Sequence, residues 1–316
     1  MKSFAFVFPG QGSQSVGMLD AWGDHPVLLQ TLQEASDALG EDIARLIREG
    51  PRETLALTTN TQPVMLVAGV AAYRIWRAEG GAEPSVVAGH SLGEYAALVA
   101  SGVLTLAQAT PLVRFRAAAM QEAVPIGAGA MAAILGLDAA GVVAGCAEAQ
   151  ASFDPASGEV VEAANFNDSA QTVIAGSKAA VDKACEVLKA RGAKRALPLA
   201  VSAPFHSILM KPAAEKLREK LAGIKLGAPA IPVINNIDVT VENAAERIRD
   251  ALYRQAFGPV RWVECIRAIK ARGVATVVEC GPGKVLAGMV KRIDPEMTGV
   301  ALFDPATLNE VKGLLS

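Results

Sequence analysis

The stretch Ser85-Val86-Val87-Ala88-Gly89-His90-Ser91-Leu92-Gly93-Glu94-Tyr95-Ala96 decides the fold. Its first four residues form a short apolar run typical of a buried strand, and Glu94 opens a helical pattern that continues to Ala100. Between the two lies Gly-x-Ser-x-Gly, whose glycines permit a tight, strained turn. Such a turn exposes the Ser91 hydroxyl at the carboxyl end of a sheet, where free N–H groups of the new helix point toward it. The stretch therefore predicts an α/β protein with Ser91 as candidate nucleophile.

Short apolar runs predict further buried strands at residues 4–8, 232–235 and 275–279. Between them, residues 62–79 and 105–123 carry apolar side chains at three- and four-residue spacing, which is typical of helices. Strands that alternate with helices favour a mostly parallel sheet covered on both faces. We therefore expect a large α/β unit with an α/β-hydrolase-like core.

The middle of the chain follows a different order of elements. From residue 128 to residue 198 the patterns alternate as strand, helix, strand, strand, helix and strand, which is the order of a ferredoxin-like unit. We predict a small ferredoxin-like subdomain at 128–198, inserted into a large subdomain formed by 1–127 and 199–316.

Composition excludes several classes of protein. The 316 residues are 51% hydrophobic and carry a formal net charge of −2, so neither a disordered chain nor a protein with a general attraction to nucleic acid or anionic membrane is expected. No apolar run is long enough to span a membrane. The four scattered cysteines form no C-x-x-C motif, which favours a reducing compartment and a cytoplasmic location.

A serine hydroxyl needs a base, and the chain has only three histidines. His90 is next to Ser91, where successive side chains point apart, so it is a candidate for lining the pocket. His25 lies in a polar turn near the start and is expected to be solvated. His206 lies in a loop after a strand, the position at which open α/β sheets carry their chemistry, and is our candidate base. A merely structural, hydrogen-bonded His206 is the alternative.

An arginine falls on the apolar side of the helix predicted around residues 105–124. Arg116 lies in the middle of the arc formed by Leu112, Val113 and Met120, whereas Arg114 projects to the opposite side. A buried arginine is costly unless an anion meets it, so Arg116 is a candidate for binding a ligand carboxylate through two parallel hydrogen bonds. A snorkelling stem or a structural ion pair is the alternative. To accommodate Pro111, we expect Thr110 to cap the helix and Pro111 to take its first position.

Three further features have weaker signals. Gln11 follows the first predicted strand between two glycines, where a side-chain donor could face a developing oxyanion or simply solvent. Residues 281–284, Gly-Pro-Gly-Lys, lack the spacing of a phosphate loop and are interpreted as a structural turn. Four basic residues near the end of the small subdomain form either a solvated face or a patch that steers an acidic or phosphate-bearing partner: Lys189, Arg191, Lys194 and Arg195.

Nearly the whole chain resembles the malonyl-CoA:acyl carrier protein transacylases of fatty-acid synthesis, to which the acyltransferase domains of polyketide synthases are close relatives. The matching motifs are residues 8–14, 89–95, 114–116, 120–121, 165–167, 171–176, 204–207, 255, 259–262 and 281–286. The resemblance implies an α/β-hydrolase-like core with a ferredoxin-like insert. It also implies transfer of malonyl from malonyl-CoA to the phosphopantetheine thiol of acyl carrier protein by a ping-pong mechanism, with no metal and no redox cofactor.

The resemblance assigns roles by matched position. Ser91 would form the acyl ester, with His206 as general base and acid, and Arg116 would bind the malonyl carboxylate. Gln11 and the backbone N–H of Leu92 would form the oxyanion hole. The segment at Gln255 would offer a backbone carbonyl to His206 in place of a carboxylate. The remaining expected substrate-binding residues are His90, Met120, Asn165 and Phe205, the last of which would narrow the pocket against a branched acyl group.

Three other functions stay open at this stage. A serine esterase would share the nucleophile and base but use water as acceptor. A related acyltransferase would carry another acyl unit, such as methylmalonyl or acetyl. A non-catalytic carrier-binding protein could keep the fold without the chemistry.

Overall fold

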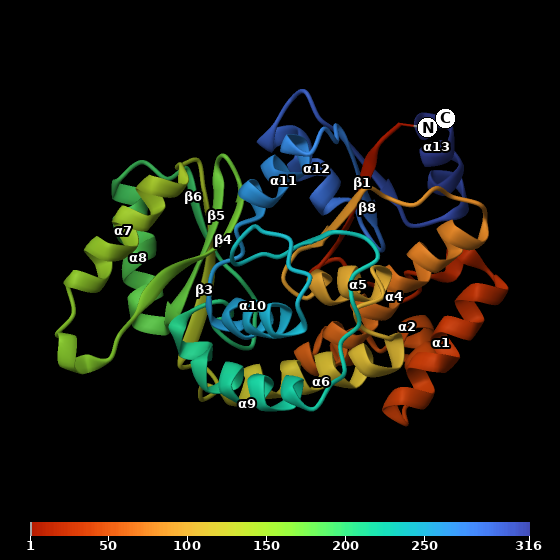
Figure 1. Ribbon diagram of the computed structural model, residues 1–316. Coiled ribbons are helices and arrows are strands. Elements are labelled where there is room, and N and C mark those ends of the chain that lie inside the picture. Colours follow the sequence, from red (N-terminus) through yellow and green to blue (C-terminus); the bar gives the residue numbers. More distant parts are fainter. Residues whose placement is uncertain (1) are drawn as a thin grey trace.

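The computed structural model describes residues 2–316 and shows a parallel sheet at the centre of the larger part of the chain (Figure 1). The sheet has five strands in the order β7-β2-β1-β8-β9, and every neighbouring pair is parallel. The strands are β1 (Phe4–Phe8), β2 (Val86–Gly89), β7 (Val233–Ile234), β8 (Thr276–Cys280) and β9 (Thr298–Leu302). The mostly parallel α/β architecture expected from the sequence is confirmed. The edge strand β9 was not expected.

Helices cover both faces of this sheet. Alternate β1 side chains divide between two cores: Phe6 and Phe8 pack in one with α4, while Ala5 and Val7 pack in the other with α11 and α12. This is what period-two alternation requires of a central strand. The helices outside the small subdomain are α1 (Pro26–Leu39), α2 (Ile43–Glu49), α3 (Arg52–Ala56), α4 (Thr58–Ala78), α5 (Gly93–Ala100), α6 (Leu106–Glu122), α9 (Lys211–Ala222), α10 (Ala245–Phe257), α11 (Trp262–Ala271), α12 (Val285–Ile293) and α13 (Pro305–Leu315).

The small subdomain lies to one side of the larger part (Figure 1). It contains β3 (Gly129–Leu135), α7 (Ala139–Ala151), β4 (Val161–Asp168), β5 (Gln171–Ser177), α8 (Lys178–Ala190) and β6 (Arg195–Pro198). Its antiparallel sheet has the order β4-β5-β3-β6, and the elements follow the β-α-β-β-α-β order expected from the sequence. One sheet face packs on α7 and α8, while Met131 and Val173 on the other face join the main core. The division at residues 127/128 and 198/199 stays a prediction.

The helix that carries Arg116 begins earlier than expected. Thr105, not Thr110, is its N-cap. The Thr105 hydroxyl accepts a hydrogen bond from the Gln108 backbone N–H at 3.2 Å, and the Gln108 Oε1 accepts one from the Thr105 backbone N–H at 3.0 Å. Pro111 therefore lies inside α6, and the prediction that it takes the first helical position is wrong. This reciprocal capping box satisfies two N–H groups at the helix start and makes Leu106 the first helical residue.

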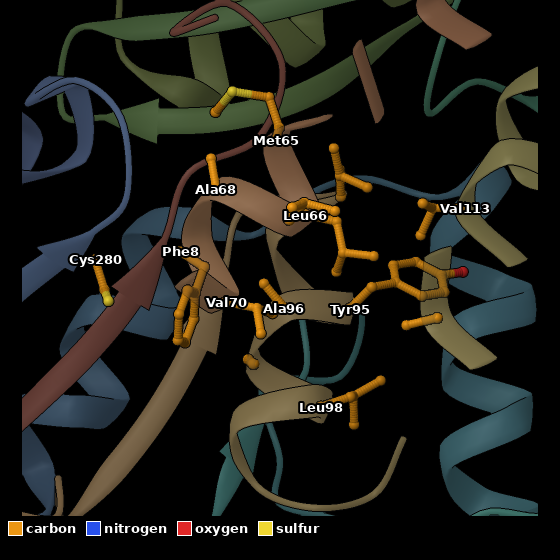
Figure 2. Close-up of a cluster of buried hydrophobic side chains, with 14 of the residues drawn as sticks. Phe8, Met65, Leu66, Ala68, Val70, Tyr95, Ala96, Leu98, Val113 and Cys280 are labelled. Atoms are coloured by element: carbon orange, nitrogen blue, oxygen red, sulfur yellow. The ribbon is translucent and has the colours of Figure 1, made fainter. Parts of the chain in front are cut away.

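The start of α5 is fixed by tight packing against β1 and α4. Figure 2 shows Phe8 of β1, Ala68 and Val70 of α4 and Ala96 of α5 close together in the core. Because these side chains are fully buried, close packing in the core holds α5 in place against β1 and α4 and so positions the turn that precedes α5. Among residues 2–316, no helix combines the length and hydropathy that a membrane span requires.

Candidate active site

The turn between β2 and α5 places Ser91 in a strained conformation. Its φ is 53°, in the left-handed region that non-glycine residues avoid at a cost of about 1–3 kcal/mol. The flanking glycines make the turn possible. A Cβ on Gly89 would lie 1.9 Å from the Gly93 carbonyl carbon, and one on Gly93 would lie 2.0 Å from the Phe8 oxygen. The strand–turn–helix predicted around Ser91 is therefore present, and only glycine fits at both flanks.

Ser91 and His206 form a hydrogen-bonded pair. The Ser91 Oγ lies 2.6 Å from the His206 Nε2, and the His206 Nδ1 lies 2.9 Å from the Gln255 carbonyl oxygen and 3.2 Å from that of Gly258. Carbonyl oxygens only accept, so Nδ1 carries the ring proton and Nε2 is free to accept from the serine hydroxyl. The backbone carbonyl expected from the segment at Gln255 is thus in contact with the imidazole.

Burial keeps the imidazole of His206 neutral. The residue is only 4% exposed, and burial, followed by the nearby charge of Arg116, lowers the pKa of His206 to about 3. A neutral imidazole leaves the Nε2 lone pair free at neutral pH, and this free lone pair is what can accept the serine proton.

The other two histidines bond elsewhere. His90 Nε2 lies 2.8 Å from the Asn167 Oδ1, with its ring beside that of Trp262, and burial lowers the pKa of His90. His25 caps α1 through its Nδ1, at 3.3 Å from the Val27 N–H. His206 is thus the histidine that bonds to the Ser91 hydroxyl, and its role as the base stays a prediction.

Arg116 is buried at 2% exposure and has only neutral hydrogen-bond partners. It donates to the Gln62 Oε1 at 2.9 Å, to the Ser91 Oγ at 3.2 Å and to the Gln255 Oε1 at 3.1 Å. Its guanidinium also lies over the Tyr95 ring, 5.4 Å from the centroid. Within residues 2–316 no ion pair joins it to a carboxylate, so the alternative of a structural ion pair does not hold for the described residues. A buried cation beside the serine is suited to an anionic ligand.

Arg114 behaves as its position on the helix predicts. Its Nη1 and Nη2 donate to the two carboxylate oxygens of Glu41, at 2.9 and 2.8 Å, in a pair near the surface. Within one turn of α6, Arg114 near the surface is paired with a carboxylate, whereas the buried Arg116 is not.

Gln11 lies on the loop after β1, and Leu92 directly follows Ser91 at the start of α5. Gln11 is exposed beyond the end of β1, and its Oε1 accepts from the Gln62 Nε2 at 3.4 Å. Next to it, a Cβ on Gly10 would lie 2.8 Å from the His90 carbonyl oxygen, so glycine is needed for this close approach. Leu92 already has helical dihedrals at the start of α5. Their joint role as an oxyanion hole stays a prediction.

The remaining predicted substrate-binding residues lie on α6, on β4 and in the loop that carries His206. Met120 is buried on α6, with its sulfur 4.0 Å from the Gln62 Nε2, and Phe205 is buried beside His206. Asn165 pairs with Val260 by a backbone bridge, and its buried Oδ1 has no partner within residues 2–316. Their roles in substrate binding stay predictions.

Sequence reasoning missed three buried polar residues at the site: Gln62, Glu94 and Asn236. Asn236 accepts from the Ser91 N–H at 2.7 Å and donates to the Gly89 carbonyl at 2.7 Å. Glu94 was present in the serine motif, and Asn236 follows a predicted strand, but neither position by itself indicates such contacts.

A cavity of about 980 Å³ reaches His206 from the side of the small subdomain. It is lined by α7, by β4 and the segment before it, by the end of α10 and by the connection that follows α10; Phe166, Phe257 and Pro259 are among the lining residues. Its volume and largely apolar lining suit a long, flexible ligand arm.

These features define a class: an α/β protein with a hydrogen-bonded serine–histidine pair at the end of its parallel sheet. Residues 5–299 match the family described as "Acyl transferase domain", and the chain belongs to that family.

Similar proteins cover almost the whole chain. The chain is 52% identical over 309 residues to "Malonyl CoA-acyl carrier protein transacylase" of Escherichia coli strain K12, covering 98% of each, and 50% identical over 317 residues to the protein of that name from Haemophilus influenzae, covering 100% of each. Among solved structures, acyl-carrier-protein S-malonyltransferase from Burkholderia pseudomallei is 64% identical with a TM-score of 0.95, covering 98% of this chain and 99% of that one. A malonyl-transacylase in complex with a type II polyketide synthase acyl-carrier protein is 51% identical with a TM-score of 0.94, covering 98% of both chains.

Proposed function

We propose that the protein moves a malonyl group from malonyl-CoA to the phosphopantetheine thiol of an acyl carrier protein, through an ester on Ser91, in fatty-acid biosynthesis. One observation carries the proposal: the Ser91 hydroxyl lies 2.6 Å from the neutral base His206 and 3.2 Å from the buried cation Arg116. Relatives at 50–52% identity over the full length carry the same activity in their names.

The first half of the cycle loads the serine. His206 Nε2 takes the Ser91 proton while Oγ attacks the malonyl thioester carbonyl, and the carbonyl oxygen becomes an oxyanion. Gln11 and the Leu92 N–H would stabilise that charge, a contribution of about 2.7–4 kcal/mol per well-placed donor. Collapse breaks the carbon–sulfur bond, and the imidazolium returns its proton to the coenzyme A thiolate.

The second half runs the same steps with another thiol. The carrier protein's phosphopantetheine thiol gives its proton to His206 and attacks the ester carbon, and Ser91 regains its proton as it leaves. Because the acyl group rests on the serine, the cycle uses no metal and no redox cofactor in our proposal. We also propose a cytoplasmic location, where malonyl-CoA and carrier protein meet.

Arg116 selects the acyl group. A malonyl carboxylate can take two charge-assisted hydrogen bonds from its guanidinium, whereas an acetyl group leaves the cation buried without an anion. Such selection favours a transferase for a dicarboxylic acyl unit over a general serine esterase.

The test compares two acceptors. Purified protein is mixed with labelled malonyl-CoA and with either holo acyl carrier protein or the apo form, which lacks the phosphopantetheine thiol. We expect rapid labelling of the holo carrier only, with slow release of free malonate. Hydrolysis faster than transfer would instead identify an esterase.

A further inference from the structure

Three buried polar side chains lie behind the serine turn: Glu94, Asn236 and Gln255, at 2%, 0% and 0% exposure. The Glu94 Oε2 accepts both the Asn236 backbone N–H at 2.8 Å and the Gln255 Nε2 at 3.0 Å. The same Gln255 amide nitrogen donates to the Ser91 carbonyl at 3.0 Å. One carboxylate therefore anchors the two residues that hold the backbone of the strained nucleophile.

Gln255 also connects this carboxylate to the buried cation. Its Nε2 faces Glu94, while its Oε1 accepts from the Arg116 Nη2 at 3.1 Å. Glu94 and Arg116 thus carry opposite charges that are bridged by one side-chain amide and make no direct ion pair. A direct contact would satisfy the guanidinium with a protein carboxylate and exclude a substrate carboxylate. Separation by an amide balances the buried charge and leaves the guanidinium available.

The geometry points to Glu94 as a positioning residue that limits how tightly Arg116 holds the acyl carboxylate; this inference rests on the proposed function. With Glu94 ionised, the pair is neutral before malonyl enters. Without that negative charge, the malonyl carboxylate becomes the only counter-charge to Arg116, so malonyl binds more tightly. Tighter holding of an acyl group that must be passed on lowers KM without raising turnover.

The test is Glu94→Gln, which removes the charge and keeps a carbonyl oxygen for both donors. Initial rates of Ser91 loading from malonyl-CoA and acetyl-CoA are measured at pH 8.5. We expect the malonyl-to-acetyl ratio of kcat/KM to rise roughly 5- to 20-fold, mainly through a lower malonyl KM, because the charges interact at a low effective dielectric.

Glu279→Gln is the matched control. Glu279 is also a fully buried glutamate, but it accepts from the Ala287 N–H at 2.9 Å at the start of α12 and has no contact with Arg116. The same substitution there should leave the ratio unchanged. A general loosening of the fold would change loading from malonyl-CoA and from acetyl-CoA by similar factors in both variants. A rise in the malonyl-to-acetyl ratio that occurs only in Glu94→Gln therefore supports the inference.

Wild-type protein gives a second measurement in case the variant does not fold. Burial raises the pKa of Glu94 to about 7, so lowering the pH from 8.5 to 6 neutralises it without a mutation. The malonyl-to-acetyl ratio should then rise as the pH falls. Four other titratable groups lie around Glu94 and Arg116. Burial raises the pKa of Tyr95 to about 12 and also raises that of Cys265, burial lowers the pKa of His206 to about 3, and the hydrogen bond from Arg254 lowers that of Asp238, so none of the four changes its charge between pH 6 and 8.5. The guanidinium of Arg116 stays protonated, as guanidinium groups in proteins do.

The outcomes separate this inference from the proposed function. If wild-type protein does not load malonyl, the proposed function fails first. If wild-type protein loads malonyl, two results would show the inference to be wrong. One is a malonyl-to-acetyl ratio that Glu94→Gln leaves unchanged or lowers, and the other is a wild-type ratio that does not change between pH 6 and 8.5. In either case, Glu94 does not control how tightly Arg116 binds the malonyl carboxylate.

Discussion

Replacing Arg116 by alanine tests the origin of acyl selectivity. The guanidinium can give a malonyl carboxylate two charge-assisted hydrogen bonds, each contributing about 1.5–3 kcal/mol. Their loss should lower kcat/KM for malonyl-CoA roughly 100- to 20,000-fold, since each 1.4 kcal/mol is a factor of about ten. An acetyl methyl group gains nothing from the guanidinium, so acetyl-CoA use should be preserved or improved.

The assay measures loading from each acyl-CoA separately and reports the malonyl-to-acetyl ratio. Arg114→Ala is the control, because Arg114 lies on the same helix but bonds to Glu41 near the surface. It should leave the ratio unchanged. An equal loss of malonyl and acetyl loading in Arg116→Ala would mean that Arg116 only supports the fold, and the selectivity argument would be refuted.

Three further predictions concern other parts of the molecule. Burial raises the pKa of Glu279 from 4.5 to about 7, so its ionisation lowers the free energy of unfolding of the wild-type protein as the pH rises through this range. Glu279→Gln should remove this loss. In urea unfolding, we expect the variant to gain up to about 3 kcal/mol in the free energy of unfolding at pH 8.5 and to gain nothing at pH 4.5. Asn236→Ala should lower kcat roughly tenfold when kcat is calculated per reactive Ser91, because the Ser91 N–H loses its hydrogen-bond acceptor. An unchanged kcat would show that Asn236 does not help to position Ser91. Reversing the charges of Lys194 and Arg195 should raise the carrier-protein KM at low salt and much less at high salt; an unchanged value would exclude steering.

The sequence predicted elements whose signals are local. Strand β1 was expected at its observed bounds and β8 within one residue, because each is a short apolar run between polar turns. β9 was missed because its residues are only partly buried and Gly299 weakens the strand pattern. The start of α6 was misplaced because the proline was assumed to mark it, whereas the helix begins at the capping box of Thr105 and Gln108.

The site could be predicted only in part. Ser91 was identified by the Gly-x-Ser-x-Gly motif, and His206 was chosen from only three histidines. Arg116 was identified because its position on the predicted helix places it among apolar side chains. The cluster behind them could not be found this way. Glu94 is bonded to residues 142 and 161 positions further along the chain, and one sequence does not show which distant polar side chains become neighbours.

The most direct test of the account is the mass of the protein after brief mixing with malonyl-CoA, followed by peptide mapping of the adduct. We predict one added malonyl group per chain, attached to the peptide that contains Ser91, and no addition to Ser91→Ala. An adduct on another residue, or no adduct in wild-type protein that still transfers malonyl, would contradict a mechanism through a serine ester.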